Sequence, residues 1–375
     1  MGLLVIVLAA AYLLNKPSNE EKQIENADTD IQPETAPAFK QIIEPDPPKE
    51  YIGELELPID GATGYASIEM DLKSSADDQS DTIEILEAGT GFVILEEVDD
   101  WWLIETNGKS GWVKHQFCLI NLPDVIPSII YNNTNTYSSK FVSSGKSLPG
   151  ITGQALYKGK TYNERLDKEE YIVPVLYAMS KKIFLAQQFA LEDDNTLVIY
   201  EGYRPYSIQQ AVVKALSTLA HADQKVMAGI NSYPWSTFWF IDTKVSNHQI
   251  GYAIDVSLAK IDSKTESTIG DYLIKEITKY TEYKMPTPIH ELSMASATFT
   301  APVSAKSPTD WKKAILDPDM NKPALLLQMY CTDAGLTPLA SEWWHFNDLD
   351  ALNSVTGNSS DGSYILSEVH SVIPL

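Results

Sequence analysis

The sequence predicts an α+β protein with two folded parts, a small β-barrel followed by a larger domain of helices and strands. Three observations lead to this prediction. The 375 residues exceed one ordinary domain of about 150 residues, and the 44% hydrophobic content is enough to bury a sizeable core. Short strand-like runs fill residues 61–122, whereas residues 123–375 alternate long apolar helical segments with buried strands.

Residues 1–15 are expected to form a signal peptide or a membrane anchor. The first fourteen are uncharged and almost wholly apolar. This stretch is shorter than the roughly 20 residues of a spanning helix but fits the apolar region of about 7–15 residues in a signal peptide. A helix of the protein core is disfavoured for residues 1–15, because the polar segment that follows cannot pack over it. We therefore expect export to the periplasm or cell envelope, with the N-terminus either cleaved or kept as an anchor.

Residues 16–60 are expected to be a disordered, acidic, Pro-rich linker. Residues 16–50 contain nine acidic residues, four lysines and six prolines. Such a segment buries too little apolar area to offset the entropy of ordering, and its prolines and like charges keep it extended.

Residues 61–122 are expected to form the small β-barrel. The run "TIEILEAGTGFVILEE" predicts two strands separated by a Gly-rich turn, and "DWWLIETNGKSGWVKHQFC" predicts a hairpin. Its turn is Asn107-Gly108, because both residues tolerate the positive φ of a type I′ turn. Trp101, Trp102 and Trp112 flank this turn.

This order of a "GTG" turn, a "WW" strand and "NGKSGWV" resembles a bacterial SH3-type domain. The resemblance covers about sixty residues. It implies a module that binds cell-wall peptides or packs on a catalytic domain. The alternative is a spacer whose tryptophans belong to its core.

Residues 123–375 contain the remaining predicted elements. Apolar content predicts a helix over residues 173–190, with Pro174 near its start, and a buried strand in "NTLVIYEGY". A second helix follows Pro205, and a third, "KPALLLQMYCTDAGL", starts near Pro323 and stops at Gly335. Two further strands are expected in "VSNHQIGYAIDVSLA" and "LASEWWHFND".

Three short segments of this domain concentrate reactive side chains. In "SNHQIGYAID", Asp255 lies on an otherwise apolar strand, where a carboxylate is costly unless it is paired or binds a cation. His248 precedes this strand, and Gly251 lets the backbone bend so that the imidazole turns back toward Asp255. In "EWWH", the side chains of Glu342 and His345 can reach one small site. The indoles of Trp343 and Trp344 would line this site and exclude water from it.

Two histidines and a carboxylate as ligands, with a second carboxylate left unbound, suit a zinc site. Nitrogen and oxygen donors without thiolate are typical of catalytic zinc, which keeps a position open for water. Cys118 and Cys331, the two cysteines of the chain, form no CxxC metal motif or disulfide scaffold. Each histidine taken alone is more often structural, and a single Glu-x-x-His is common by chance. The occurrence of both motifs in one domain favours the metal interpretation.

The third segment is "EGYRP", where Arg204 lies between a buried strand and a helix. A guanidinium held there can stabilise the oxyanion that forms when a carbonyl is attacked. The alternative is that Arg204 pairs with a carboxylate for stability.

The segments "EGYRP", "SNHQIGYAID" and "SEWWHF", in this order, resemble the VanX-type D-alanyl-D-alanine dipeptidases, which are zinc D,D-peptidases. The resemblance covers residues 123–375 and implies the zinc D,D-peptidase fold, a small antiparallel sheet with flanking helices, with one Zn²⁺ per chain. It implies zinc ligands at His248, Asp255 and His345, a general base and acid at Glu342, and an oxyanion-stabilising residue at Arg204.

The same resemblance implies substrate-binding residues at Tyr131, in "IIYNN", and at Ser246. It also reveals a departure. In "MPTPIHELS", His290 stands where the family has an Asp that binds the ammonium group of the dipeptide. An imidazole supplies no full negative charge, and the side chain of the adjacent Glu291 would point the other way on an extended chain.

The expected function is therefore zinc-dependent hydrolysis of D-Ala-D-Ala or related cell-wall peptides in peptidoglycan turnover. One alternative is a D,D-carboxypeptidase acting on longer stem peptides, which a wall-binding SH3-type module would favour. A second is a non-enzymatic wall-binding protein with a relict site. The net charge of −23 repels phosphate backbones, so no nucleic-acid partner is expected.

Overall fold

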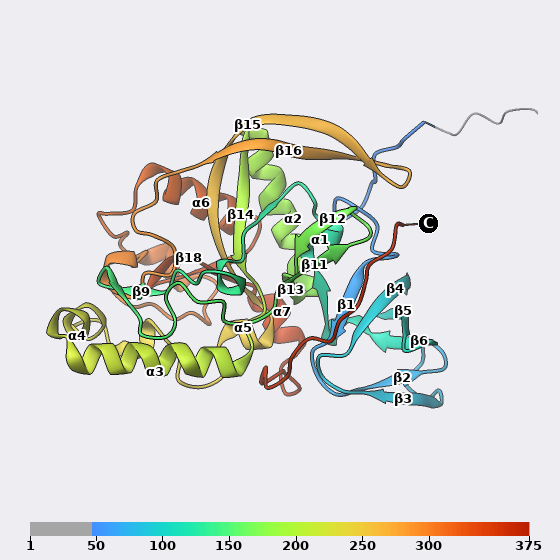
Figure 1. Cartoon of the computed structure of the whole chain (residues 1–375), viewed down its shortest axis with the longest axis horizontal. Coiled ribbons are helices and arrows are strands. Elements are labelled where there is room, and N and C mark those ends of the chain that lie inside the picture. The colour runs from blue at the N-terminus through green and yellow to red at the C-terminus, as the bar shows by residue number, and fades with distance from the viewer. Residues whose placement is uncertain (1–46, 375) are drawn as a thin grey trace, which may run out of the picture. The chain divides into compact units, whose positions relative to one another are not determined.

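The structure is a computed structural model that describes residues 47–374. They form a mixed α+β unit with two larger sheets, as Figure 1 shows. The expected signal peptide or anchor and most of the expected linker lie outside the described residues. Within residues 47–374, no helix is both long and apolar enough to cross a membrane.

The first sheet takes up most of residues 63–121 and gains one strand from further along the chain. Its strand order is β13-β7-β1-β4-β5-β6-β2-β3, and every neighbouring pair is antiparallel. The strands are β1 (Thr63–Ala66), β2 (Met70–Lys73), β3 (Thr82–Leu86), β4 (Gly91–Val98), β5 (Trp101–Thr106), β6 (Lys109–Lys114), β7 (Cys118–Asn121) and β13 (Pro174–Leu176).

The hairpin predicted at Asn107-Gly108 is confirmed. Asn107 has φ 51° and Gly108 has φ 72°, and they connect β5 to β6. Trp102 on β5 is fully buried, and its ring lies 4.6 Å from the ring of Tyr177 at the start of α2. This indole therefore belongs to the core that joins the first sheet to the rest of the unit.

The second sheet holds the central strands of the larger part. Its order is β17-β18-β15-β14-β8, and β16 pairs with the outer length of β15. Only the β14–β8 pair is parallel among these described strands. The strands are β8 (Ile130–Tyr131), β14 (Asn195–Glu201), β15 (Ala253–Ile269), β16 (Tyr272–Glu282), β17 (Thr337–Leu339) and β18 (Glu342–Asn347).

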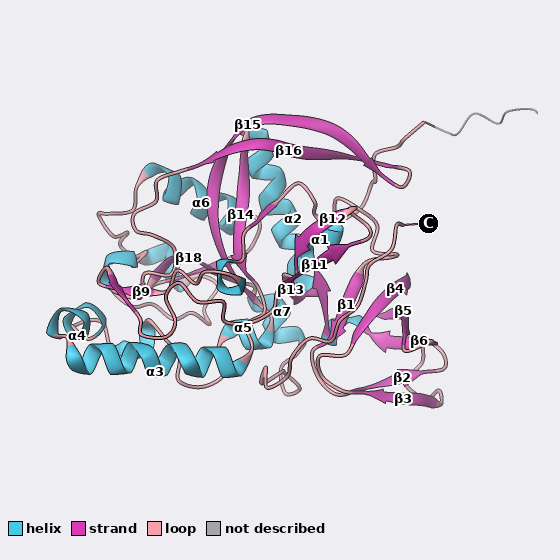
Figure 2. Cartoon of the chain, in the orientation of Figure 1, coloured by secondary structure: helices cyan, strands magenta, loops and turns pink. Residues whose placement is uncertain are grey.

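The helices surround this sheet, as Figure 2 shows, with α2 packed on β14 and α6 on β15. They are α1 (Leu122–Val125), α2 (Tyr177–Glu192), α3 (Tyr206–Ala222), α4 (Gln224–Ile230), α5 (Asn247–Ile250), α6 (Lys322–Asp333) and α7 (Leu349–Ser354). Two small hairpins complete the strands, β9 (Val142–Ser143) with β10 (Lys146–Ser147), and β11 (Lys160–Asn163) with β12 (Lys168–Tyr171).

The predicted boundaries of α6 are close to those observed. The Asn321 side chain accepts a hydrogen bond from the Ala324 N–H at 3.2 Å, which caps the first turn. Pro323 lies in that turn, where its missing N–H costs nothing. Gly335 has φ 90° and follows the last turn, as a helix stop requires.

The single helix predicted over residues 173–190 is wrong at its start. Pro174 begins the strand β13, which pairs with β7, and the helix α2 starts only at Tyr177. β13 is an edge strand, where a proline without an N–H is tolerated. Helical periodicity could not reveal this pairing, because the partner strand lies more than fifty residues earlier.

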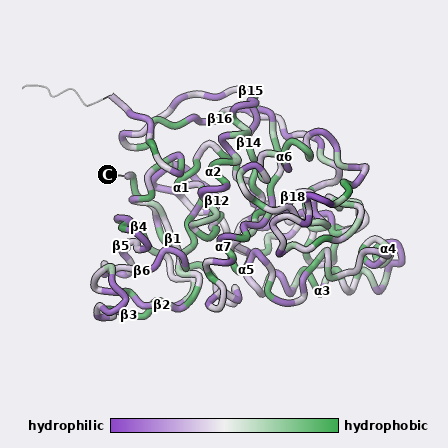
Figure 3. The backbone as a smooth tube through the Cα atoms, turned by 180° about the vertical axis from the view of Figure 1, so that it is seen from behind, coloured by the Kyte–Doolittle hydropathy of each residue, from purple (hydrophilic) through white to green (hydrophobic). Residues whose placement is uncertain are grey.

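The long ribbon of β15 and β16 crosses the unit in Figure 1, and its outer part is mostly hydrophilic in Figure 3. Near its tip, Leu57 is buried against Ile269 and Ile274. The packed chain therefore begins before residue 61, inside the segment assigned to the linker. The C-terminal segment also contacts the first sheet, because the Ser367 N–H donates to the Gly89 carbonyl at 2.9 Å.

Candidate metal centre

Three buried side chains come together from α5, β15 and β18. His248 lies on α5, which ends at Gly251 with φ 91°. A Cβ at residue 251 would lie 2.6 Å from the Leu119 side chain, so both conformation and space call for glycine. The chain then turns into β15, which carries Asp255 directly opposite His345 of β18. Residues that lie directly opposite each other on paired strands have their side chains on the same face of the sheet.

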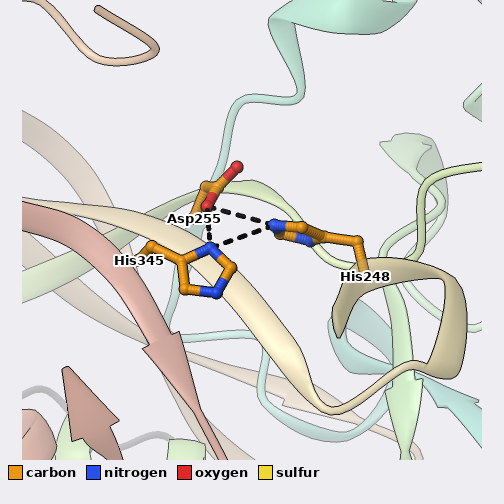
Figure 4. A group of neighbouring side chains, drawn as sticks. All are labelled: His248, Asp255 and His345. Atoms are coloured by element: carbon orange, nitrogen blue, oxygen red, sulfur yellow. Dashed lines mark hydrogen bonds and ion pairs between the residues drawn. The ribbon is translucent and has the colours of Figure 1, made fainter. Parts of the chain in front are cut away.

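The three donor atoms form a nearly equilateral triangle, drawn in Figure 4. His248 Nε2 lies 3.2 Å from His345 Nδ1 and 3.3 Å from Asp255 Oδ1. His345 Nδ1 lies 3.1 Å from the same oxygen. Ligands 2.0–2.1 Å from a tetrahedral zinc ion are separated by about 3.3–3.4 Å. The spacing of the three atoms therefore suits a small tetrahedral metal ion.

Hydrogen bonds on the far side of each ring fix which nitrogen faces the centre. His248 Nδ1–H donates to the Gly202 carbonyl at 2.7 Å, which leaves the lone pair of Nε2 facing inward. His345 Nε2–H donates to Asn347 Oδ1 at 3.0 Å, which leaves the lone pair of Nδ1 facing inward. Together with Asp255 Oδ1, three potential ligand atoms converge. When both rings are neutral, this arrangement is repulsive unless a cation lies at its centre.

Glu342 lies beside this group because β18 pairs irregularly with β17. Pro338 pairs with Phe346 and Leu339 with Glu342, so three residues of β18 have no partner on β17. In a regular strand, residues three apart would face opposite sides. Here Glu342 Oε2 lies 3.7 Å from His345 Nδ1. Burial raises the pKa of Glu342 to about 8, which is suited to accepting and donating a proton near neutral pH.

Arg204 is held just beyond β14 by a buried network of acceptors. Its Nε donates to Glu201 Oε2 at 2.7 Å, its Nη1 to Gln209 Oε1 at 2.8 Å, and its Nη2 to both Glu201 and Asp255 Oδ2. Four of the five N–H groups of a guanidinium thus have protein partners. Arg204 thus pairs with two carboxylates, as the alternative interpretation of this residue expected. One N–H of its guanidinium has no protein partner among the described residues and remains for a ligand. Although burial opposes it, the charges of Glu201 and Asp255 raise the pKa of Arg204, so it stays charged.

A cavity of about 170 Å³ opens onto the metal-ligand candidates. Trp344 is part of its wall, whereas the Trp343 indole N–H donates to Thr287 Oγ1 at 2.9 Å. One of the two indoles therefore faces the site. The residues of the site that line the cavity are Arg204, His248, Asp255, Glu342, Trp344 and His345.

The three residues expected to bind substrate lie in different places. Ser246 lines the cavity. Tyr131 does not line it, and its hydroxyl donates to the Ile126 carbonyl at 2.9 Å. His290 is fully buried behind the site, with Nε2 3.1 Å from Asp255 Oδ2. Tyr131 and His290 therefore do not line this cavity.

The sequence interpretation missed two residues that support the site. Glu201 is fully buried and accepts hydrogen bonds from Arg204, from the Tyr157 hydroxyl at 2.8 Å and from Asn135 Nδ2 at 2.7 Å. Asn347 fixes the His345 ring. Alternation along a strand already places Asn347 on the same face as His345, so this residue could have been found from the sequence. Two of the partners of Glu201 could not, because Tyr157 and Asn135 lie more than forty residues away in the sequence.

No family model matches this chain, and no curated protein matches it. The chemistry of the site is therefore inferred from its residues. Within residues 47–374, buried His and Asp side chains are positioned to bind a metal ion, next to a buried carboxylate and a fixed guanidinium on one small cavity.

Proposed function

We propose that this protein is a zinc peptidase that hydrolyses D-Ala-D-Ala or related cell-wall peptides. The observation that carries the proposal is the convergence of three potential ligand atoms, His248 Nε2, His345 Nδ1 and Asp255 Oδ1, at mutual distances of 3.1–3.3 Å. The peptide class rests on the likeness of "EGYRP", "SNHQIGYAID" and "SEWWHF" to the D-alanyl-D-alanine dipeptidases.

His248, Asp255 and His345 would hold the ion. Two imidazoles and one carboxylate, without thiolate, are a typical donor set of catalytic zinc. The two cysteines are both buried and free, and neither joins the group. When bound, zinc supplies a Lewis acid that polarises a peptide carbonyl and makes water a better nucleophile.

Glu342 is the residue of this chain that moves the proton. Its side chain is largely buried and lines the cavity, where it can take a proton from the attacking water and pass it to the leaving amine. Burial raises the pKa of this carboxyl group to about 8, which suits proton transfer near neutral pH.

Arg204 orients the reacting carbonyl. Its bonds to Glu201 and Gln209 hold the guanidinium rigid, so its remaining N–H can meet a developing negative charge without reorganisation. Trp344 forms part of the apolar wall of the cavity. At about 170 Å³ the cavity is smaller than the roughly 300–1,000 Å³ typical of sites for drug-sized ligands, which favours a short peptide.

Two measurements test this function together. Metal content of the purified protein should show one zinc per chain, whereas a relict site would hold none. Released D-alanine should then be measured after incubation with D-Ala-D-Ala and, separately, with a muramyl pentapeptide. Release from the pentapeptide alone would make the protein a D,D-carboxypeptidase, and release from neither would remove the peptidase proposal.

We extend the proposal to the location of the protein. An SH3-type module at residues 61–122 would hold the catalytic part near its wall substrate, and export would bring it there. Support comes from the sequence motifs and from the apolar start of the chain. Sedimentation of the full chain with purified peptidoglycan tests the wall contact, and its absence would leave the module as a spacer.

A further inference from the structure

Gln249 follows the zinc-ligand candidate His248 on α5 and is fully buried. It does not line the cavity at the metal-ligand candidates, so it makes no direct contact with a ligand there. A buried amide is costly unless both its donor and its acceptor are satisfied. The partners of Gln249 therefore indicate what this side chain does.

Both groups of the amide bond to segments that carry residues of the site. Gln249 Nε2 donates to the Arg204 carbonyl at 2.8 Å. Gln249 Oε1 accepts the backbone N–H of Ser246 at 2.7 Å, which closes the first turn of α5. The side chain thus ties the start of the helix that carries His248 to the segment that carries Arg204.

This tie bears directly on the ring of His248. Nδ1 of the ring donates to the Gly202 carbonyl at 2.7 Å, two residues before Arg204. The short segment 202–204 therefore accepts one hydrogen bond from the ring and one from Gln249. Displacement of this segment would move both the carbonyl that orients the imidazole and the guanidinium of Arg204. Residues beyond the ligands of a metal site commonly orient the ligands in this way.

The C-terminal segment, residues 360–372, packs against Gln249 through Gly362. Gly362 has φ 66°, and a Cβ on this residue would lie 2.4 Å from Gln249 Cγ and 2.5 Å from Gln249 Cβ. Glycine lets the two chains approach this closely without displacing a side chain. A segment that follows β18 and α7 in the sequence thus lies in direct contact with the helix of His248.

Gly362 is also fixed to the segment that carries Arg204. Its carbonyl accepts the Tyr206 N–H at 2.9 Å and lies 3.1 Å from the Tyr203 hydroxyl. That hydroxyl lies 2.8 Å from the Tyr364 carbonyl, and the two tyrosine rings stack with their centres 5.0 Å apart. The Arg204 segment, Gln249 and Gly362 therefore contact one another in pairs, so a shift of one affects the other two.

Further along, the C-terminal segment is anchored on the first sheet. The Ser367 N–H donates to the Gly89 carbonyl at 2.9 Å, and Ser367 Oγ accepts the Gly91 N–H at 2.6 Å. These two bonds hold the segment at a place that does not line the cavity. The position of Gly362 against α5 is thus supported from both of its sides.

We propose that Gln249 is a positioning residue of the candidate metal centre and that Gly362 of the C-terminal segment holds it in place. This inference rests on the proposed function, because it concerns the zinc site. With both contacts intact, His248 and Arg204 are oriented before the ion binds, and less ordering is needed on binding. Loss of either contact should therefore appear as weaker zinc binding.

The test measures the zinc affinity of the full chain by competition with a chelator. Gln249→Met keeps the length of the side chain and removes both hydrogen bonds. It should weaken zinc binding about 10–100-fold, the range for residues that orient a ligand. The visible absorption of the cobalt-substituted protein should change as well, because it depends on the geometry of the ligands. Neither measurement requires turnover of a peptide.

Gln187→Met is the matched control. Gln187 on α2 is fully buried, its Nε2 donates to the Ser128 carbonyl at 3.0 Å, and its Oε1 accepts the Leu197 N–H at 2.9 Å. It does not line the cavity. Both Met variants lose buried hydrogen bonds and should lower the unfolding midpoint of the metal-free protein, but zinc affinity should fall only in Gln249→Met.

A pair of glycine variants tests the contact with the C-terminal segment. Gly362→Ala and Gly357→Ala each add a Cβ at a residue with positive φ, 66° and 86°, so they share the strain of the left-handed region. The Cβ at residue 357 would meet no atom within 4 Å, whereas the Cβ at residue 362 would meet Gln249. Zinc affinity should therefore fall in Gly362→Ala and stay that of wild type in Gly357→Ala.

The outcomes separate this inference from the proposed function. Wild-type zinc affinity in Gln249→Met or in Gly362→Ala would overturn the inference and leave the peptidase in place. An equal fall in Gln187→Met or Gly357→Ala would show a general loss of stability and would also overturn it. A wild-type protein that binds no zinc would overturn the function and the inference together, whereas zinc binding without release of D-alanine would overturn the peptidase alone.

Discussion

Asp255 and His345 lie directly opposite each other on neighbouring antiparallel strands, with Asp255 Oδ1 3.1 Å from His345 Nδ1. They are ninety residues apart in the sequence, yet the register of β15 and β18 points both side chains to one face. His248 completes the group from the helix that leads into β15. The candidate metal site thus depends on the pairing of these two strands, and its geometry should respond to any change in that pairing.

The first prediction concerns the ligands. His248→Ala, His345→Ala and Asp255→Ala should each lose bound zinc and activity together, since two ligands rarely retain the ion. Elemental analysis of the purified variants measures this. His221→Ala, which changes an exposed histidine on α3, should keep one zinc per chain. Stoichiometric zinc in all three ligand variants would refute the assignment.

The second prediction separates Glu342 from the ligands. Glu342→Gln should keep the zinc and reduce turnover about 10²–10⁴-fold, which is typical of a general acid–base residue. Zinc content and kcat measured on the same preparation test this. An empty site in this variant would instead make Glu342 a ligand.

The third prediction concerns His290, whose Nε2 lies 3.1 Å from Asp255 Oδ2. His290→Leu should weaken zinc binding about 10–100-fold, because residues that orient a ligand have effects of this size. His290→Gln keeps an N–H donor and should lose less. Competition with a chelator measures the affinity, and unchanged affinity in the Leu variant would show that Asp255 is held by Arg204 alone.

The fourth prediction concerns the buried pair of Glu201 and Arg204. Glu201→Gln should lower the free energy of unfolding by about 3–5 kcal/mol, because the buried guanidinium of Arg204 loses one of its two carboxylate partners and keeps only Asp255. Urea denaturation measures the change. Lys158, exposed and paired with Glu368, offers a control, since Lys158→Met should change the stability by no more than about 1 kcal/mol. Similar values for the two variants would argue against a structural role for Glu201.

The fifth prediction addresses the two-domain interpretation. A fragment that begins at residue 123 lacks β7, the partner of β13, and exposes Tyr177, which packs on Trp102. We expect this fragment to be less soluble and less stable than the chain from residue 47 onward, as shown by thermal unfolding. A stable fragment that binds zinc would show that residues 123–375 fold alone.

The sequence by itself determined the local elements and the donor set of the site. Asn107-Gly108 predicts its hairpin, and Asn321, Pro323 and Gly335 bound α6, because turns and helix ends depend on a few adjacent residues. The α+β class follows from the same periodicities. The pairing of His248, Asp255 and Glu342 with His345 was expected from motifs that also carry the family likeness.

Only the tertiary structure decided what each of these side chains faces. The β13 strand at Pro174 exists because β7 supplies its hydrogen bonds. Glu342 and His345 share one side because β18 pairs irregularly with β17. His290 turns toward Asp255 and does not line the cavity. These relationships join segments that are far apart in the chain, and burial of polar groups forces each one to find a partner that no local pattern reveals.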